Sequence, residues 1–465
     1  MLHHEKSKQT MLLMVVTLVM ILRTPEVHCI VESLNILDDV LRFTQNGSPV
    51  RVPIQQVALG SNGAILWAAA QDGVLYQINA TTMAYINSTT LATTVGFASG
   101  LFVDDTFGRV YACYAASAGV NAISVFLINS ATLAQVTTAC TFNPSGSTPN
   151  LFATQHFYDP LSRKLASITY FSNTGSFIGY HAITVASDSC SAVDFTIHTQ
   201  LTSITGVQYT NSTDSLVMWT YTQSQNGQWL QQLLFFSAIS SESGSFSATT
   251  IDSAPPFGGS VSPPFAGTAS GGNLEYLSGP MTFTSTYDYA VYISSTVPSN
   301  GSAVVQYANP VTSASPYTPK GMVTFPTEPT MLAISLDETA ISSTAGVIFI
   351  STTDGQLKKY RYSDDGTNPM AVTTPNYNSG TFIDSPPPYI SSQVYSKTTQ
   401  SIYLASGTTA GGVWRVPFHS CHTATSCTTC IALNDPYCGW CPLGNLCGTL
   451  SICSTGIREF LFCCT

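Results

Sequence analysis

The chain has 465 residues, of which 44% are apolar and only 9% are charged. This composition predicts a folded chain with a sizeable buried core, because disorder goes with low hydrophobicity and high net charge. The formal net charge is −10, and neither acidic nor basic residues gather in a block. Nucleic acid is therefore excluded as an expected partner, since phosphate binding requires clustered Lys and Arg.

The N-terminal residues have the layout of an export signal. Lys6 and Lys8 precede a 12-residue run, Met11–Leu22, that is apolar apart from Thr17. The run is too short to cross a bilayer core of about 30 Å, but it fits the hydrophobic region of a signal peptide. We expect residues 1–29 to be a signal peptide and the protein to be secreted. A short buried segment is the alternative, and no later run is long enough to predict a membrane anchor.

Five N-x-S/T sequons agree with export, because this motif accepts N-linked glycans in secreted chains. One sequon is a weak signal in a chain rich in Ser and Thr, but the set supports a glycosylated extracellular surface. The predicted glycosylation sites are Asn46, Asn79, Asn87, Asn211 and Asn300.

Residues 30–418 read as β-structure, with short apolar runs separated by Gly, Asn, Asp, Ser and Pro. Aligning the runs gives a repeat of strand, polar turn, second strand, polar loop and third strand. It occurs seven times, mostly at a spacing of 45 to 57 residues, with a Ser/Gly/Pro-rich insertion at 237–272. The second strands are expected at 65–67, 110–112, 165–167, 216–218, 290–292, 347–349 and 402–404. The pattern predicts an all-β fold, a seven-bladed β-propeller with four-stranded blades; two β-sandwiches are the alternative.

The two ends of the repeat region complement one another. The seventh unit stops after its third strand, because Cys421 follows closely. A missing fourth strand could come from Ile36–Phe43 or Val50–Ile54, ahead of the first unit. Such closure would remove an open sheet edge.

The cysteines divide the chain in two. Of the 13 cysteines, nine fall in the last 45 residues, and only Cys113, Cys140 and Cys190 lie between Cys29 and His419. The shift marks a domain boundary near His419, with a small module at 419–465 that needs disulfides because it cannot bury enough surface. Zinc is the alternative, since two C-x2-C pairs occur here, but an exported chain favours oxidation.

The C-terminal module carries a distinctive string. Residues 435–441 read Asp-Pro-Tyr-Cys-Gly-Trp-Cys, and over 421–463 the chain resembles the PSI module of plexins, semaphorins and integrins. A PSI module directly after a propeller is similar to the sema-domain superfamily. The Trp440-Cys441 pair makes the chain look plexin-like, because semaphorins usually have Trp-Asp at this place.

The resemblance implies a disulfide pairing for the module, with Cys464 left over. The implied pairs are Cys421 with Cys438, Cys427 with Cys463, Cys430 with Cys447, and Cys441 with Cys453. Trp440 lies between two of these cysteines in the sequence and is expected to pack on them as part of the structural core, because a small domain needs every large side chain. In the propeller, Cys113 is expected to pair with Cys140, because the two lie on neighbouring strands.

The resemblance implies an extracellular protein-recognition module, either secreted or the outer part of a truncated receptor. Its implied partner is a semaphorin-like protein or a related propeller, a homodimer is possible, and no cofactor or metal is expected. We expect no catalysis: His156, His181 and His198 are isolated, and Asp104-Asp105, Asp337-Glu338 and Asp364-Asp365 are expected in hairpin turns. A secreted propeller enzyme or carbohydrate-binding protein, and a structural adhesion or matrix protein, are the alternatives.

Overall fold

The computed structural model describes part of the chain. The described residues are 40–91, 97–115, 123–136, 140–142, 149–159, 163–171, 177–184, 188, 191–198, 203–210, 215–223, 229–237, 249–252, 281–283, 289–295, 302–308, 319–325, 331–342, 345–352, 357–363, 372–377, 390–408, 411–419, 421–433, 435, 437–441 and 445–449. Between residues 141 and 390, side chains are described only at His156, Tyr158, Arg163, Leu165, Asp188, Val347 and Phe349. The predicted signal peptide, the sequons at Asn211 and Asn300, and Cys190, Cys453, Cys463 and Cys464 lie outside the described residues.

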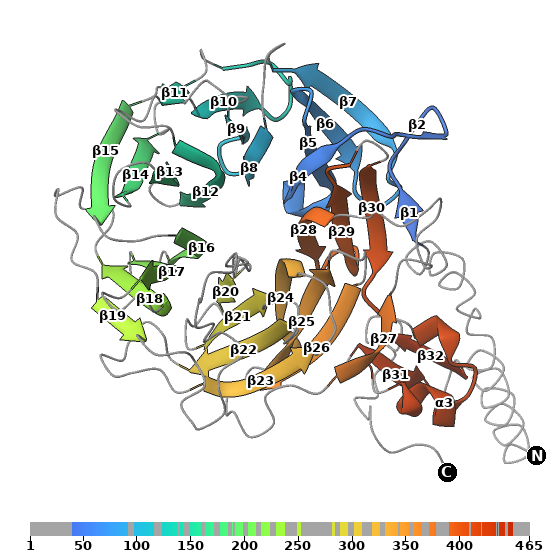
Figure 1. Ribbon diagram of the computed structural model, residues 1–465. Coiled ribbons are helices and arrows are strands. Elements are labelled where there is room, and N and C mark those ends of the chain that lie inside the picture. The colour runs from blue at the N-terminus through green and yellow to red at the C-terminus, as the bar shows by residue number, and fades with distance from the viewer. Residues whose placement is uncertain are drawn as a thin grey trace, which may run out of the picture.

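Within the described ranges, the strands form seven four-stranded antiparallel sheets that surround a common centre (Figure 1). The first three sheets in chain order contain β4 (Ile54–Gly60), β5 (Ile65–Ala70), β6 (Val74–Asn79) and β7 (Tyr85–Thr90); β8 (Phe97–Asp104), β9 (Arg109–Ala115), β10 (Ile123–Asn129) and β11 (Cys140–Phe142); and β12 (Pro149–Asp159), β13 (Lys164–Phe171), β14 (Phe177–Thr184) and β15 (Ser191–His198).

The next three sheets repeat the pattern. They contain β16 (Ser203–Thr210), β17 (Ser215–Gln223), β18 (Trp229–Ser237) and β19 (Thr249–Asp252); β20 (Met281–Phe283), β21 (Tyr289–Ser295), β22 (Ser302–Ala308) and β23 (Pro319–Phe325); and β24 (Met331–Ser342), β25 (Ala345–Thr352), β26 (Leu357–Ser363) and β27 (Val372–Tyr377). The seven expected second strands fall within β5, β9, β13, β17, β21, β25 and β29.

The last sheet combines both ends of the repeat region in the order β1-β30-β29-β28. Its strands are β1 (Leu41–Arg42), β28 (Ile390–Ser396), β29 (Ser401–Ser406) and β30 (Gly412–Pro417). The expected N-terminal closing strand is therefore confirmed, and it comes from the first of the two candidate segments. The second candidate contributes its last residue, Ile54, to β4.

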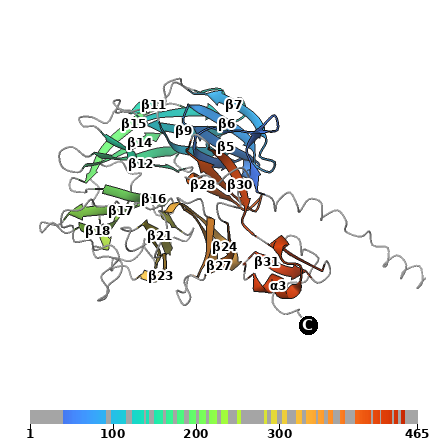
Figure 2. The same ribbon diagram turned by 45° about the vertical axis from the view of Figure 1, so that its right-hand side comes forward.

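The first strands of consecutive sheets contact one another around a closed ring. β4 contacts β8, β8 contacts β12, and the series continues through β16, β20, β24 and β28 back to β4. Figure 2 shows the sheets stacked around this ring from a second direction. The expected propeller fold is thus confirmed, and the two-sandwich alternative is wrong, because sandwiches do not form such a ring of neighbouring sheets.

Burial follows from this stacking. All residues of β29 and β30 are buried, and a core cluster joins Ile54 and Leu66 of the first sheet to Tyr403 and Val413 of the last. Because each sheet is covered on both faces, few positions can hold a solvated charge, which accounts for the low charged fraction.

The expected turn position of Asp337 is wrong: Asp337 lies in β24, opposite Val347.

The C-terminal module is small and contains mixed elements. These are η4 (Cys421–Thr423), α3 (Cys427–Ala432) and the hairpin of β31 (Cys438–Cys441) and β32 (Leu446–Thr449). Ser426 caps α3, since its Oγ accepts a hydrogen bond from the backbone N–H of Thr429 at 3.2 Å. No helix among the described segments is long and apolar enough to span a bilayer.

The loops after β6 and β10 share one structure. Asn79 Oδ1 accepts hydrogen bonds from the N–H groups of Thr81 at 3.0 Å and Thr82 at 2.8 Å. Asn129 Oδ1 does the same, with Ala131 and Thr132 at 3.0 Å each. In both loops a buried apolar residue follows with a left-handed backbone, Met83 or Leu133, each with φ of 58°. In each loop the asparagine therefore stabilises a turn in which the buried apolar residue, Met83 or Leu133, adopts a sterically unfavourable backbone conformation.

We predict that Asn79→Ala and Asn129→Ala each lower the free energy of unfolding by about 1 kcal/mol, because two backbone N–H groups lose their acceptor. Urea titration of the deglycosylated protein measures the effect. Thr90→Ala, an exposed position on β7, is the control and should leave stability unchanged. Equal stability of all four proteins would contradict the role assigned to these two asparagines.

Candidate protein-binding surface

The turn between β8 and β9 is organised by the buried carboxylate of Asp104. Its Oδ1 accepts a hydrogen bond from the N–H of Phe107 at 3.2 Å, and Gly108 adopts a φ of 61° that completes the turn. Its Oδ2 accepts a hydrogen bond from the hydroxyl of Tyr158, which lies on β12 of the next sheet. The expectation that Asp104 serves turn structure is confirmed, but its second oxygen also ties two sheets together.

Arg163, which directly precedes β13, extends this contact. Its Nε lies 3.9 Å from Asp104 Oδ2, and its Nη2 donates to the hydroxyl of Tyr111 at 3.4 Å. The guanidinium carbon lies 3.8 Å from the ring centroid of Phe107, which is a cation–π contact. Arg163 has a φ of 53°, so the contacts compensate for an unfavourable backbone conformation.

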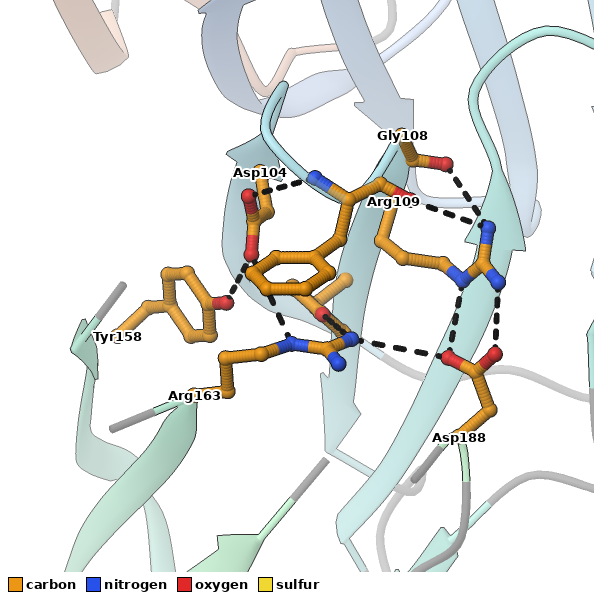
Figure 3. A network of polar contacts seen from close by, with 8 residues as sticks. Asp104, Gly108, Arg109, Tyr158, Arg163 and Asp188 are labelled. Atoms are coloured by element: carbon orange, nitrogen blue, oxygen red, sulfur yellow. Dashed lines mark hydrogen bonds and ion pairs between the residues drawn. The ribbon is translucent and has the colours of Figure 1, made fainter. Parts of the chain in front are cut away.

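Asp188 joins the two arginines of the cluster. Arg109 donates to it through two nitrogens, Nε to Oδ1 at 2.9 Å and Nη2 to Oδ2 at 2.6 Å. Arg163 Nη2 lies 3.7 Å from the same Oδ1. Figure 3 shows Asp188 facing the guanidinium groups of Arg109 and Arg163. The hydrogen bonds from Arg109 lower the pKa of Asp188, so the carboxylate stays charged near neutral pH.

This cluster is built to hold a side chain in place. Both carboxylates accept hydrogen bonds and lie beside guanidinium groups, an arrangement that suits structural support better than proton transfer. Phe107 is 47% exposed although its ring rests on Arg163. A large aromatic side chain that is exposed yet packed on a guanidinium group is a candidate protein-binding anchor, because little conformational entropy would be lost on binding.

A Ser–His pair lies nearby, on the first strands of two adjacent sheets. Ser99 Oγ lies 2.7 Å from His156 Nε2 and also donates to the carbonyl oxygen of Cys113 at 3.3 Å. Burial lowers the pKa of His156 to about 3. An imidazole with so low a pKa is a weak general base near neutral pH, so the pair does not favour the enzyme alternative.

Two of the implied disulfides are present in the module, Cys421–Cys438 and Cys430–Cys447. Cys427 and Cys441 are also disulfide-bonded, while Cys463 and Cys453, the partners implied for them, lie outside the described residues. Oxidation at these positions contradicts the zinc alternative for both C-x2-C pairs. Trp440 packs against the cluster of bridged cysteines, as expected.

The expected pair of Cys113 and Cys140 is wrong. Cys113 lies on β9 and Cys140 on β11, and both are register partners of Val125 on the intervening β10. Two strand spacings separate them by about 9–10 Å, beyond the reach of a disulfide. Cys113 is a free, buried thiol whose pKa is raised by burial, and Cys140 is bonded to another cysteine.

The three described sequons differ in their surroundings. Asn46 is exposed in the turn between β2 (Thr44–Gln45) and β3 (Ser48–Pro49). Asn87 is exposed on β7, whereas Asn79 is partly buried and holds the loop described above. Glycosylation at all three positions stays a prediction.

The arginine cluster was missed by reasoning from the sequence. Arg109 and Arg163 follow Asp104 and Asp159 by five and four residues in equivalent turns. In a chain with only 15 Lys and Arg residues, that repetition is a usable signal. Asp188 could not have been found in this way, because its contact with Arg109 forms only when the second and third sheets are stacked.

We predict that stability falls as the pH is lowered from 6.5 to 5, by about 1–2 kcal/mol from His156 alone. The folded pKa is depressed, so the unfolded chain binds more protons in this window, and acid favours unfolding. Denaturant titrations at several pH values measure the slope. His156→Gln should flatten it, and an identical slope in that variant would contradict the assignment.

Comparisons with known proteins bear on the module and on the fold separately. A family model for PSI, described as the plexin repeat, matches residues 420–459. Plexin A3 of Danio rerio is 36% identical over 107 residues, which are 23% of this chain and 5% of that protein. The match thus spans about one twentieth of the relative's length.

Solved structures share the fold of most of the chain. Drosophila Semaphorin 1b, extracellular domains 1-2, aligns with a TM-score of 0.57 at 12% identity, covering 91% of this chain and 94% of that one. A chain of Drosophila Plexin A in complex with Semaphorin 1b gives 0.57 at 11% identity, covering 91% and 95%. The resemblance inferred from the sequence is confirmed: a sema-type propeller and a PSI module give this chain the architecture of a plexin-like ectodomain.

Proposed function

We propose that this chain is an exported protein-recognition module without catalytic activity, which binds a semaphorin-like protein in cell–cell signalling or guidance. Residues 1–29 would serve as the signal peptide, 30–418 as the propeller and 419–465 as the PSI module. The observation that carries the proposal is the plexin-like module, matched at 420–459, directly after a propeller of the semaphorin and plexin fold. A complex of Drosophila Plexin A with Semaphorin 1b among the similar structures supports the choice of partner class.

The junction between propeller and module supports a role as a rigid unit. Tyr437 of the module packs on Phe418, with ring centroids 4.3 Å apart, and stacks at 6.2 Å on Phe349 of β25. Phe418 also packs at 5.5 Å on Tyr395 of β28. Because these rings join the module to two propeller sheets, the module would hold the propeller in a fixed orientation for binding.

The contact surface is assigned to the side of the propeller that carries the Phe107 turn. Protein interfaces of about 800 Å² per partner depend on a few aromatic and arginine side chains. Phe107 lies over Arg163, and Arg109 is braced by Asp188, so the surface offers both residue types in a preorganised form. The proposed binding site is this turn and its arginine support.

We predict that Phe107→Ala weakens binding to a semaphorin ectodomain by about tenfold or more, because an anchor residue contributes at least about 1.4 kcal/mol. Surface plasmon resonance of the secreted chain against a panel of semaphorin ectodomains measures the affinity. Ile431→Ala is the matched control, since Ile431 on α3 is 46% exposed against 47% for Phe107.

Two outcomes would contradict the proposal in different ways. Binding that is unaffected by Phe107→Ala would place the interface elsewhere on the molecule. Failure to bind any semaphorin ectodomain, together with self-association in sedimentation velocity, would favour the structural adhesion or matrix alternative. Hydrolysis of a glycan substrate would support the enzyme alternative instead.

A further inference from the structure

The outermost strand of the first sheet, β7, has a ladder with β6, and among the described residues its outer side is bridged only just before its first residue, where Ala84 pairs with Thr44 of β2. It pairs with β6, and in the sheet order β4-β5-β6-β7 it is the edge strand. The register pairs Ile78 with Tyr85 and Gln77 with Asn87, which leaves Ile86 as an extra residue in a β-bulge. Ile86 is 46% exposed. An edge strand with an exposed apolar residue is a template for pairing with a second chain.

The residue next to this apolar position is a glycan acceptor. Asn87, Ser88 and Thr89 form a sequon, and Asn87 is exposed on β7. Its Oδ1 accepts the N–H of Ser88 at 2.9 Å, which leaves the side-chain nitrogen Nδ2 for substitution. A glycan is bulky and hydrophilic, so one attached here would lie over the edge that carries Ile86.

The other two described sequons are placed differently. Asn46 has a φ of 53° and, with Gly47 at 76°, forms the tip of a two-residue hairpin turn. Asn79 is partly buried and uses Oδ1 to hold its loop, a role that Asn129 fills in the next sheet without a sequon. Among these three, Asn87 alone combines exposure, a sheet edge and an adjacent exposed apolar side chain.

We propose that Asn87 carries an N-linked glycan that covers Ile86 and the unpaired edge of β7, and so prevents edge-to-edge association of two copies of this chain. This inference rests on the export proposed above. The modification transfers an oligosaccharide from a lipid diphosphate donor to Nδ2. The sugar C1–N bond forms, the C1–O bond to phosphate breaks, the lipid diphosphate leaves, and Nδ2 loses one proton to a base.

The first test is site mapping on the full chain secreted from eukaryotic cells. Peptide N-glycosidase treatment in ¹⁸O-water converts each glycosylated Asn to labelled Asp, which mass spectrometry locates. We expect label at Asn87 and Asn46. Label at Asn46 with none at Asn87 would overturn the inference while leaving export intact. A chain that stays in the cell with neither site labelled would overturn the proposed export, and the inference with it.

The second test measures association. Asn87→Gln and Thr89→Ala each destroy the sequon through a different residue, and both should shift the protein towards dimers and larger species in sedimentation velocity. Asn46→Gln, which also removes one sequon, is the matched control and should sediment as the wild type does. Adding Ile86→Thr to Asn87→Gln should reverse much of the association.

Folding of each variant is checked by its circular dichroism spectrum and melting temperature. Wild-type sedimentation of both sequon variants, with folded spectra, would contradict the shielding role. Association of Asn46→Gln to the same degree would contradict it as well, because loss of any glycan would then suffice. If a sequon variant fails to fold, enzymatic removal of the glycans from folded wild-type protein, compared with Asn87→Gln/Ile86→Thr, gives the same readout.

Discussion

Closure of the ring of sheets is the constraint on which the rest of the molecule depends. Leu41 and Arg42 pair with Arg415 and Trp414 of β30, and the N–H of Phe43 donates to the carbonyl of Val413 at 2.8 Å. The Arg42 guanidinium also lies over the Trp414 ring, 4.9 Å from its centroid. A few residues from the N-terminal side thus complete a sheet formed near the C-terminal side, and the stacked core has no open end there.

The polar features of the molecule follow from that packing. Sheets stacked on both faces leave turns and edges as the places where charge can be solvated. The Asp104, Arg109, Arg163 and Asp188 cluster lies at such turns, and its ion pairs cross from the second sheet to the third. Tyr403, which burial holds at a pKa of about 12, donates from the last sheet to the carbonyl of Ala80 in the first at 2.8 Å. Polar contacts between neighbouring sheets therefore accompany the apolar core around the ring.

Local patterns in the sequence were enough to predict the strands, the repeat and the closing segment. A buried strand needs a short apolar run and a turn needs polar or small residues, and both can be recognised from neighbouring residues alone. The bridges Cys421–Cys438 and Cys430–Cys447 were implied by a motif and not by spacing. Contacts between elements were not predictable in this way. Cys113 and Cys140 are close in the sequence, yet β10 lies between their two strands. The separation becomes visible only in the strand register, where Val125 of β10 pairs with both cysteines. Asp188 and Ser99 likewise acquire their partners through the stacking of sheets.

The position of β30 has a mechanical consequence. This strand lies between β29 and the closing strand β1, and it leads within a few residues to Phe418, against which Tyr437 of the module packs. A pulling force on the module would act along the length of β30. The hydrogen bonds from β30 to both neighbouring strands would then be loaded in shear and would resist the force at the same time. The aromatic rings at the junction would spread the same load to β25 and β28. The strand that closes the ring is thus also the one through which tension would enter the propeller.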